Sequence, residues 1–132
     1  VARALHLPEP SCHEGLREKH FGAVQGVPKN ELAELNPALL EQILRRNPAA
    51  EFVGGESLDE FADRVIAAIE HIGTRHRGER VLIITHGWVM DVVTRHIAGH
   101  AREAVLHVKR KNGECVWVAV TQTIQAATPV SN

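Results

Sequence analysis

A short apolar run, Val81–Ile84, most constrains what this chain can fold into. Four unbroken aliphatic residues between Arg80 and a Thr-His-Gly turn at 85–87 are typical of a strand that is buried on both faces of a parallel sheet. Behind the turn, apolar residues recur at helical spacing, so a helix should follow directly: Val89, Val92, Val93 and Ile97. A buried strand leading into a helix predicts an α/β fold.

This pattern places His86 at the carboxyl end of the strand and beside the first turn of the helix. Open α/β sheets bind ligands at this position, and the unpaired N–H groups of a helix start favour an anion. His86 is therefore a candidate phosphate-binding residue, and the alternative is a capping or core histidine. The sequence contains no G-x-G-x-x-G, G-x-x-x-x-G-K-[ST] or G-x-S-x-G motif, so nucleotide-binding and serine-hydrolase interpretations find no support.

Length and composition exclude several classes of protein. The 132 residues predict a single domain spanning residues 1–132, and a net charge of -1 gives no electrostatic case for binding nucleic acid or an acidic membrane. No apolar run approaches the roughly 20 residues that span a bilayer. Cys12 and Cys115 are too few for a disulfide framework, so a cytoplasmic protein is expected. His96 and His100 lie four residues apart, but without further ligands they predict neither a metal site nor a cofactor.

The clearest helix begins after Ser57, which forms a capping box with Glu60, and runs to about Arg75. Its apolar stripe comprises Leu58, Phe61, Ala62, Val65, Ile66, Ile69 and Ile72. Two shorter helices, 28–35 and 37–46, each start near a proline and form either a lid over a site or ordinary packing.

The remaining segments carry weaker patterns. Residues 1–7 resemble the end of a helix stopped by Pro8 and Pro10, and residues 11–26 form an irregular loop after a short strand. An Asn-Gly turn at 111–113 joins a strand at 104–109 to an antiparallel partner at 114–120. A last extended segment covers 121–128, and residues 129–132 should be loose.

Three motifs stand in order along the chain: Leu16-x-Glu18-x-x-Phe21-Gly22-x-x-x-Gly26, then Gly54-Gly55-Glu56-Ser57 with Arg64, then Ile84-Thr85-His86-Gly87. Their order and spacing resemble the histidine phosphatase superfamily, which includes the phosphoglycerate mutases and many small phosphatases. The resemblance implies a three-layer α/β sandwich of the phosphoglycerate mutase-like type. It also implies hydrolysis or transfer of phosphomonoesters through a phosphohistidine intermediate, with a small phosphorylated substrate and no cofactor.

The resemblance assigns a role to each matched residue. Glu18 would be the proton donor and His86 would help to hold the phosphoryl group, so both are catalytic candidates. Phe21, Gly22 and the backbone N–H of Gly87 would bind substrate. A positioned carboxylic acid contributes roughly 10²–10⁴-fold to such a reaction, and the donor needs a raised pKa to carry its proton. Glu56 and Ser57 would mainly shape the site.

The sequence departs from the family pattern at the nucleophile, which lies in an Arg-His-Gly motif that these residues do not contain. We therefore expect a carboxyl-terminal portion of such an enzyme, with the first two strands of the sheet missing and the chain by itself inactive. Exposed strand edges would then favour self-association. The alternative is a non-catalytic remnant or a phosphate-binding module.

Two further expectations concern the substrate. The stretch between Glu18 and Gly55 holds only two short helices, which favours a phosphatase over a mutase. Few basic residues flank the proposed site, which argues against a poly-phosphorylated substrate.

Overall fold

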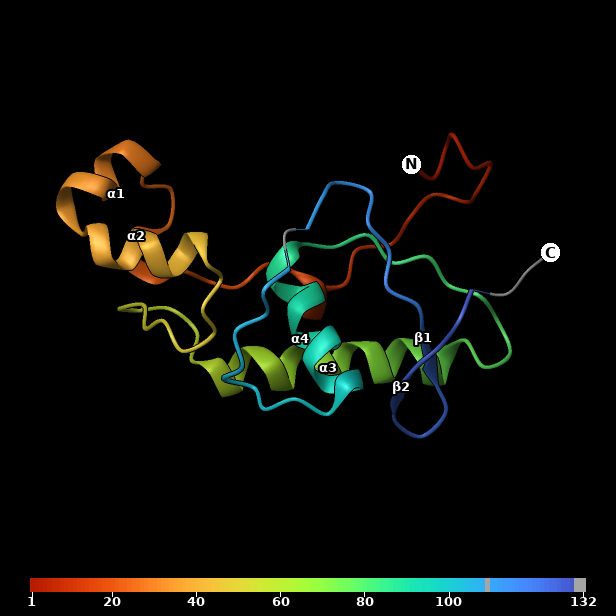
Figure 1. Cartoon of the computed structure of the whole chain (residues 1–132). Helices are drawn as coiled ribbons and strands as arrows, with labels where there is room; N and C mark the ends of the chain where they lie inside the picture. The colour runs from red at the N-terminus through yellow and green to blue at the C-terminus, as the bar shows by residue number, and fades with distance from the viewer. Residues whose placement is uncertain (109, 130–132) are drawn as a thin grey trace.

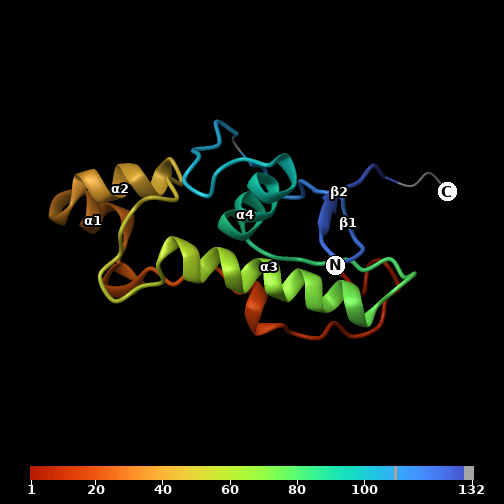
Figure 2. The same ribbon diagram turned by 90° about the horizontal axis from the view of Figure 1, so that it is seen from below.

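The computed structural model describes residues 1–108 and 110–129 (Figure 1). Its elements in chain order are η1 (Glu14–Leu16), η2 (Gly22–Val24), α1 (Lys29–Leu35), α2 (Pro37–Leu44), α3 (Leu58–Arg75), α4 (Gly87–Ala98), β1 (Val118–Val120) and β2 (Ile124–Ala126). The long helix α3 is the element on which η1, α4, β1 and β2 pack. Figure 2 shows α4 and the β1–β2 hairpin on one side of α3 and the segment with η1 on the other.

Helix α3 has the start and the end that its sequence predicts. Ser57 Oγ accepts the Glu60 N–H at 3.1 Å, and Glu60 Oε2 accepts the Ser57 N–H at 2.9 Å, so the capping box is formed. Its apolar stripe faces the interior, where Phe61 and Val65 are only 2% and 0% exposed. The predicted helix is therefore confirmed, and its apolar face forms part of the hydrophobic core.

Helix α4 begins directly after His86, as predicted, and ends at Gly99 in the left-handed conformation (φ 71°) that glycine adopts without strain. Its apolar face packs on α3 and on β2, and Val89 is fully buried. The core is completed by Phe52, Trp88 and Ile124. The packing of α4 on α3 fixes the first turn of α4, where the candidate site lies.

The strand predicted at Val81–Ile84 is not formed in the described part of the chain. Val81, Leu82 and Ile84 are 46%, 53% and 64% exposed, and the described sheet has two strands, β1 and β2. The prediction of a strand buried on both faces is therefore wrong for this structure. The physical reason is that a strand needs at least one hydrogen-bonding neighbour, as β1 and β2 have in each other, and no described segment pairs with residues 81–84.

The carboxyl-terminal pairing also differs from the prediction. No strand forms over 104–108, and residue 109 lies outside the described residues. The Asn-Gly turn is present, with Gly113 at φ 86°. However, β1 pairs with β2 in antiparallel register, Val118 opposite Ala126, rather than with 104–109. The two loops have nearly the same length, residues 110–113 in the predicted hairpin and 121–123 in the observed one, so loop-closure entropy does not decide between them. The last extended segment, predicted over 121–128, is confirmed in part, because residues 124–126 form β2 and residues 121–123 form the bend before it. Residues 130–132 of the expected loose end lie outside the described residues.

The amino-terminal predictions are partly confirmed. Residues 1–7 form hydrogen-bonded turns rather than a helix, with Leu7 N–H bonded to Ala2 O at 2.9 Å. The left-handed φ of 55° at His6 ends any helical path there. The loop at 11–26 is irregular as predicted, although it contains η1 and η2 and no strand. Helices α1 and α2 are confirmed, and Figure 1 shows them projecting together beyond one end of α3.

Neither a membrane-spanning helix nor a metal site is found in the described residues. Within the described residues, no helix combines the length and the apolarity that crossing a bilayer requires. In the same residues, no group of three or more His, Cys, Asp and Glu side chains is placed to hold a metal ion.

Candidate active site

The structure brings Glu18 to the first turn of α4, although the two segments lie far apart in sequence. Glu18 Oε2 accepts the Trp88 N–H at 3.5 Å across 70 positions, and Oε1 accepts the Lys19 N–H at 3.0 Å. Thr85 Oγ1 donates to the Leu16 carbonyl at 2.8 Å and ties the same two segments together. The first and third motifs of the sequence therefore meet, as their predicted roles require.

The pKa of Glu18 is raised above its ordinary value. Burial of the carboxyl group is the main cause, and the negative charge of Asp91 adds to it. The N–H groups of Lys19 and Trp88 and the charge of His86 act in the opposite direction but do not outweigh burial. A carboxyl group that holds its proton more firmly than usual suits a general acid.

His86 occupies the position before α4, with extended backbone at φ -121° and ψ 165°. Its side chain is exposed, and in the described structure it makes no capping hydrogen bond. The capping and core interpretations of this histidine are therefore wrong. As the N-cap residue, His86 directly precedes the first turn, whose N–H groups favour an anion. Gly87 is the first residue of that turn.

The second motif holds the loop that carries Glu18. Arg64 Nε and Nη2 donate to the two carboxylate oxygens of Glu56 at 2.9 and 2.7 Å. Nη1 donates to the carbonyls of Gly15 and Arg17 at 2.9 and 3.0 Å, and Nη2 lies 3.5 Å from the carbonyl of Glu18. One guanidinium group thus fixes the backbone of three residues around Glu18, which is the shaping role that the sequence predicted for this motif.

Glu56 completes this network from its other side. Its Oε1 accepts the His20 N–H at 2.9 Å, and its own N–H donates to the His20 carbonyl at 3.1 Å. Burial raises the pKa of Glu56, but the hydrogen bonds from Arg64 and His20 and the charges of Arg64 and Arg17 together outweigh burial and lower it. Glu56 is therefore charged at neutral pH, and the Arg64–Glu56 pair is ionic.

Phe21 and Gly22, both predicted to bind substrate, have clear packing roles. The Phe21 ring lies 5.1 Å from the ring of Phe52 and 5.5 Å from that of Trp88, in edge-to-face arrangements. Gly22 has φ 60°, and a Cβ there would collide with the carbonyl oxygen of Val53. These contacts explain both residue types, and a role in substrate binding stays a prediction.

A buried lysine lies under the same aromatic cluster. Lys19 is 2% exposed, and its Nζ lies 5.3, 5.7 and 5.5 Å from the ring centres of Phe52, Phe61 and Trp88. Burial is the main cause that lowers its pKa. The ring faces stabilise the ammonium group in place of water. The residue next to Glu18 is thereby anchored in the core.

Sequence reasoning missed a cationic group beside the first turn of α4. Arg46 Nε donates to Asp91 Oδ2 at 2.7 Å, and Arg110 Nε donates to Asp91 Oδ1 at 2.7 Å. The expectation that few basic residues flank the site is therefore wrong. Asp91 could have indicated that a cation lies here, because a charged residue on the apolar face of a helix must have a partner when it is buried. The sequence contained no indication of which cations these would be.

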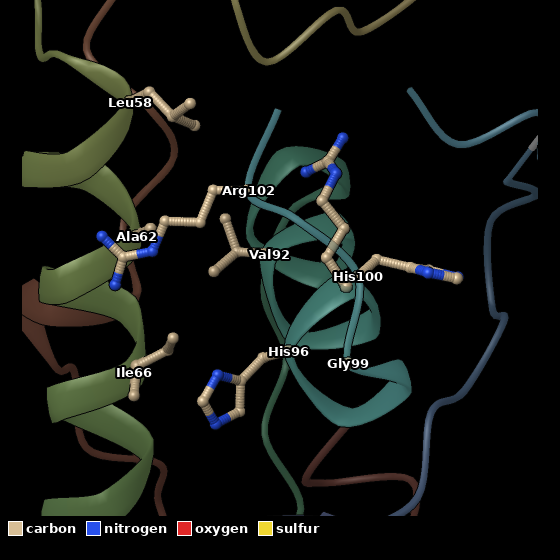
Figure 3. Close-up of a pocket in the computed structure, with 9 residues that line it drawn as sticks. Leu58, Ala62, Ile66, Val92, His96, Gly99, His100 and Arg102 are labelled. Carbon is tan, nitrogen blue, oxygen red and sulfur yellow. The ribbon is translucent and has the colours of Figure 1, made fainter. Parts of the chain in front are cut away.

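A pocket of about 260 Å³ opens elsewhere, between α3 and α4. Figure 3 shows Ala62 and Ile66 on α3 facing His96 on α4. In the same view His100 points away from His96, so the two histidines that sequence spacing paired do not converge on one point. The pocket contains neither Glu18 nor His86 and stands apart from the candidate active site.

The chain belongs to the histidine phosphatase superfamily, because the model of branch 1 of that superfamily matches residues 1–128. It has the α/β fold of the phosphoglycerate mutase-like proteins. Its structure matches that of YhfR from Bacillus stearothermophilus with a TM-score of 0.74 and 25% sequence identity, over 87% of this chain and 58% of that one.

Three curated relatives define its neighbourhood within the superfamily. A metal-independent phosphoserine phosphatase of Arabidopsis thaliana is 36% identical over 94 residues, covering 70% of this chain and 40% of that protein. Phosphoglycerate mutase-like protein 4 of the same plant is 37% identical over 89 residues, covering 67% and 39%. The probable phosphoglycerate mutase GpmB of Salmonella paratyphi A is 26% identical over 125 residues, covering 89% and 58%. The chain therefore spans between two-fifths and three-fifths of the length of these relatives.

Proposed function

We propose that this chain carries the proton donor and part of the phosphoryl-binding site of a phosphomonoester hydrolase. The observation that carries the proposal is the contact between Glu18 and the first turn of α4, with His86 close enough to affect the ionisation of Glu18. Membership of the histidine phosphatase superfamily supports the reaction class. The names of the relatives, a phosphatase and phosphoglycerate mutases, support a small phosphorylated substrate.

In the proposed reaction, the ester P–O bond breaks as the phosphoryl group passes to a histidine nitrogen. Glu18 gives its proton to the departing alkoxide, and His86 with the N–H of Gly87 holds the phosphoryl oxygens. The Glu18 carboxylate then takes a proton from water, which attacks phosphorus, breaks the P–N bond and releases phosphate. The Arg-His-Gly motif of the nucleophile does not occur in these 132 residues, so we propose that the nucleophile lies outside them and that they are inactive alone.

The test compares two leaving groups with the full-length protein. Glu18→Gln should slow hydrolysis of an alkyl phosphate about 10²-fold or more, because an alkoxide needs a proton. It should slow 4-nitrophenyl phosphate far less, because nitrophenolate leaves without one. Glu14→Gln is the matched control, since Glu14 belongs to the same segment and, among the described residues, its carboxylate pairs only with exposed Arg17. Equal slowing of both substrates by Glu18→Gln would refute the assignment of Glu18 as the acid.

Two other functions deserve the same assay. A mutase would transfer the phosphoryl group to a second position of its substrate, whereas a phosphatase releases inorganic phosphate. The short α1–α2 segment between Glu18 and Gly55 favours the phosphatase. The lack of Arg-His-Gly in the 132 residues favours a phosphate-binding module, which would bind phosphate without turnover.

A further inference from the structure

Arg46 extends from the end of α2 to the first turns of α4. Its backbone has φ 46°, in the left-handed region that residues other than glycine rarely adopt. This conformation ends α2 as a helix C-cap, in which the Asn47 N–H donates to the Gln42 carbonyl at 3.0 Å. The side chain makes separate contacts. The contacts here are Nε to Asp91 Oδ2 at 2.7 Å and Nη2 to the Val108 carbonyl at 3.0 Å. They hold the guanidinium group against α4.

The third nitrogen of this guanidinium faces the start of α4. Nη1 donates no hydrogen bond to any described residue, and a Cβ placed on Gly87 would lie 3.9 Å from it. Because Gly87 has no side chain, nothing from that residue separates Nη1 from the backbone of the first turn. The Arg46 side chain is 25% exposed, so a ligand from solvent can reach it.

Two arginines meet one buried carboxylate beside the first turns of α4. Both oxygens of Asp91, which is 1% exposed, are already occupied by Arg46 and Arg110. Arg110 also lies near a second carboxylate, with Nη1 3.9 Å from Glu114 Oε2, whereas Arg46 pairs within the described residues with Asp91 alone. An anion at the first turn of α4 would give the Arg46 Nη1 an acceptor, which it lacks among the described residues.

We propose that Arg46 is a substrate-binding residue of the candidate active site, and that its Nη1 donates to an oxygen of the phosphoryl group. The inference rests on the proposed function, since it places the phosphoryl group at His86 and Gly87. The planar fork of a guanidinium suits two acceptors at once, so one edge can stay on Asp91 while the free N–H groups take phosphate. Arg46 also links α2 to the site, so phosphate would stabilise the position of the α1–α2 segment.

The experiment measures inorganic phosphate binding to the full-length protein by isothermal titration calorimetry, without any turnover. Arg46→Gln should weaken binding about tenfold or more, the loss expected for one charge-assisted hydrogen bond. Arg46→Lys keeps the positive charge but not the planar fork of the guanidinium group. Its phosphate affinity should lie between those of the wild type and Arg46→Gln. Arg45→Gln is the matched control, because the neighbouring Arg45 pairs only with exposed Glu41. Arg110→Gln removes the other cation from Asp91 and should weaken binding less than Arg46→Gln.

Two results would overturn the proposal: phosphate affinity of Arg46→Gln equal to that of the wild type, or equal losses for Arg46→Gln and Arg110→Gln. If Arg46→Gln does not fold, Arg46→Lys decides, and unchanged affinity in that variant overturns the proposal. The proposed function fails separately. If the wild-type protein binds phosphate through Arg46 but hydrolyses no ester, the proposed hydrolase function is refuted and the role of Arg46 stands. If the wild-type protein is active but phosphate binding is unaltered in Arg46→Gln, the role of Arg46 is refuted and the proposed function stands.

Discussion

Replacing Arg64 by glutamine tests whether the Arg64–Glu56 pair positions the Glu18 loop. The side chains of Arg64 and Glu56 are 15% and 13% exposed. Arg64→Gln therefore leaves a largely buried carboxylate without its cation and frees the carbonyls of Gly15 and Arg17. Breaking a fully buried ion pair costs about 3–5 kcal/mol. Because both groups keep some contact with water and the carbonyls can be hydrated, we expect about 2–4 kcal/mol here.

The assay is equilibrium unfolding in urea of the full-length protein, and the matched control is Arg102→Gln. Arg102 also bridges two carboxylates, Asp59 at 2.8 Å and Asp63 at 2.6 Å, but these are 77% and 69% exposed. Exposed pairs contribute about 0–1 kcal/mol, so the control should lose little. A loss below about 1 kcal/mol for Arg64→Gln, or equal losses in the two variants, would refute the reasoning.

A double-mutant cycle separates the pair from its surroundings. Glu56→Gln combined with Arg64→Gln should cost less than the sum of the single changes, because the double variant leaves no unpaired charge. The same variants should slow hydrolysis of an alkyl phosphate, since the Glu18 loop loses its support. Activity unchanged in Arg64→Gln despite lost stability would show that this pair stabilises the fold without positioning the acid.

Two further predictions concern pH and association. The lowered pKa of Glu56 means that this carboxylate adds stability above its unfolded pKa, about 4.3, and that the contribution is lost as pH falls through its folded pKa. The raised pKa of Glu18 has the opposite effect: the free energy of unfolding falls as pH rises from about 4.3 through the folded pKa. Glu18→Gln should therefore be more stable than the wild type at neutral pH, as measured by unfolding in urea. The exposed Leu82 and Ile84 should make the isolated 132-residue chain self-associate, and replacing both by lysine should shift its mass toward monomer in light scattering. A monomeric wild-type chain would contradict the last prediction.

Local chemistry explains why α3 and α4 could be predicted from the sequence. The cap of Ser57 and Glu60 and the stripe that follows it define α3 from neighbouring residues alone, and Gly99 marks the end of α4 in the same way. The run Val81–Ile84 was predicted from equally local evidence and failed. Whether a run of aliphatic residues becomes a strand depends on a partner elsewhere in the chain, which local patterns do not specify.

The residues of the candidate site also differ in whether local sequence could identify them. Glu18, His86 and Gly87 were identifiable because they lie in motifs, whereas Arg46 reaches α4 across 45 positions and matches no motif. Its partner Asp91 lies one turn beyond Gly87 on the same helix, so the carboxylate that fixes Arg46 and the turn proposed to hold phosphate move as one rigid unit. A change that shifts α4 should therefore alter the cation and the backbone N–H groups together. The geometry of the site depends on the packing of α4 against α3 more than on the exposed loops that carry its side chains.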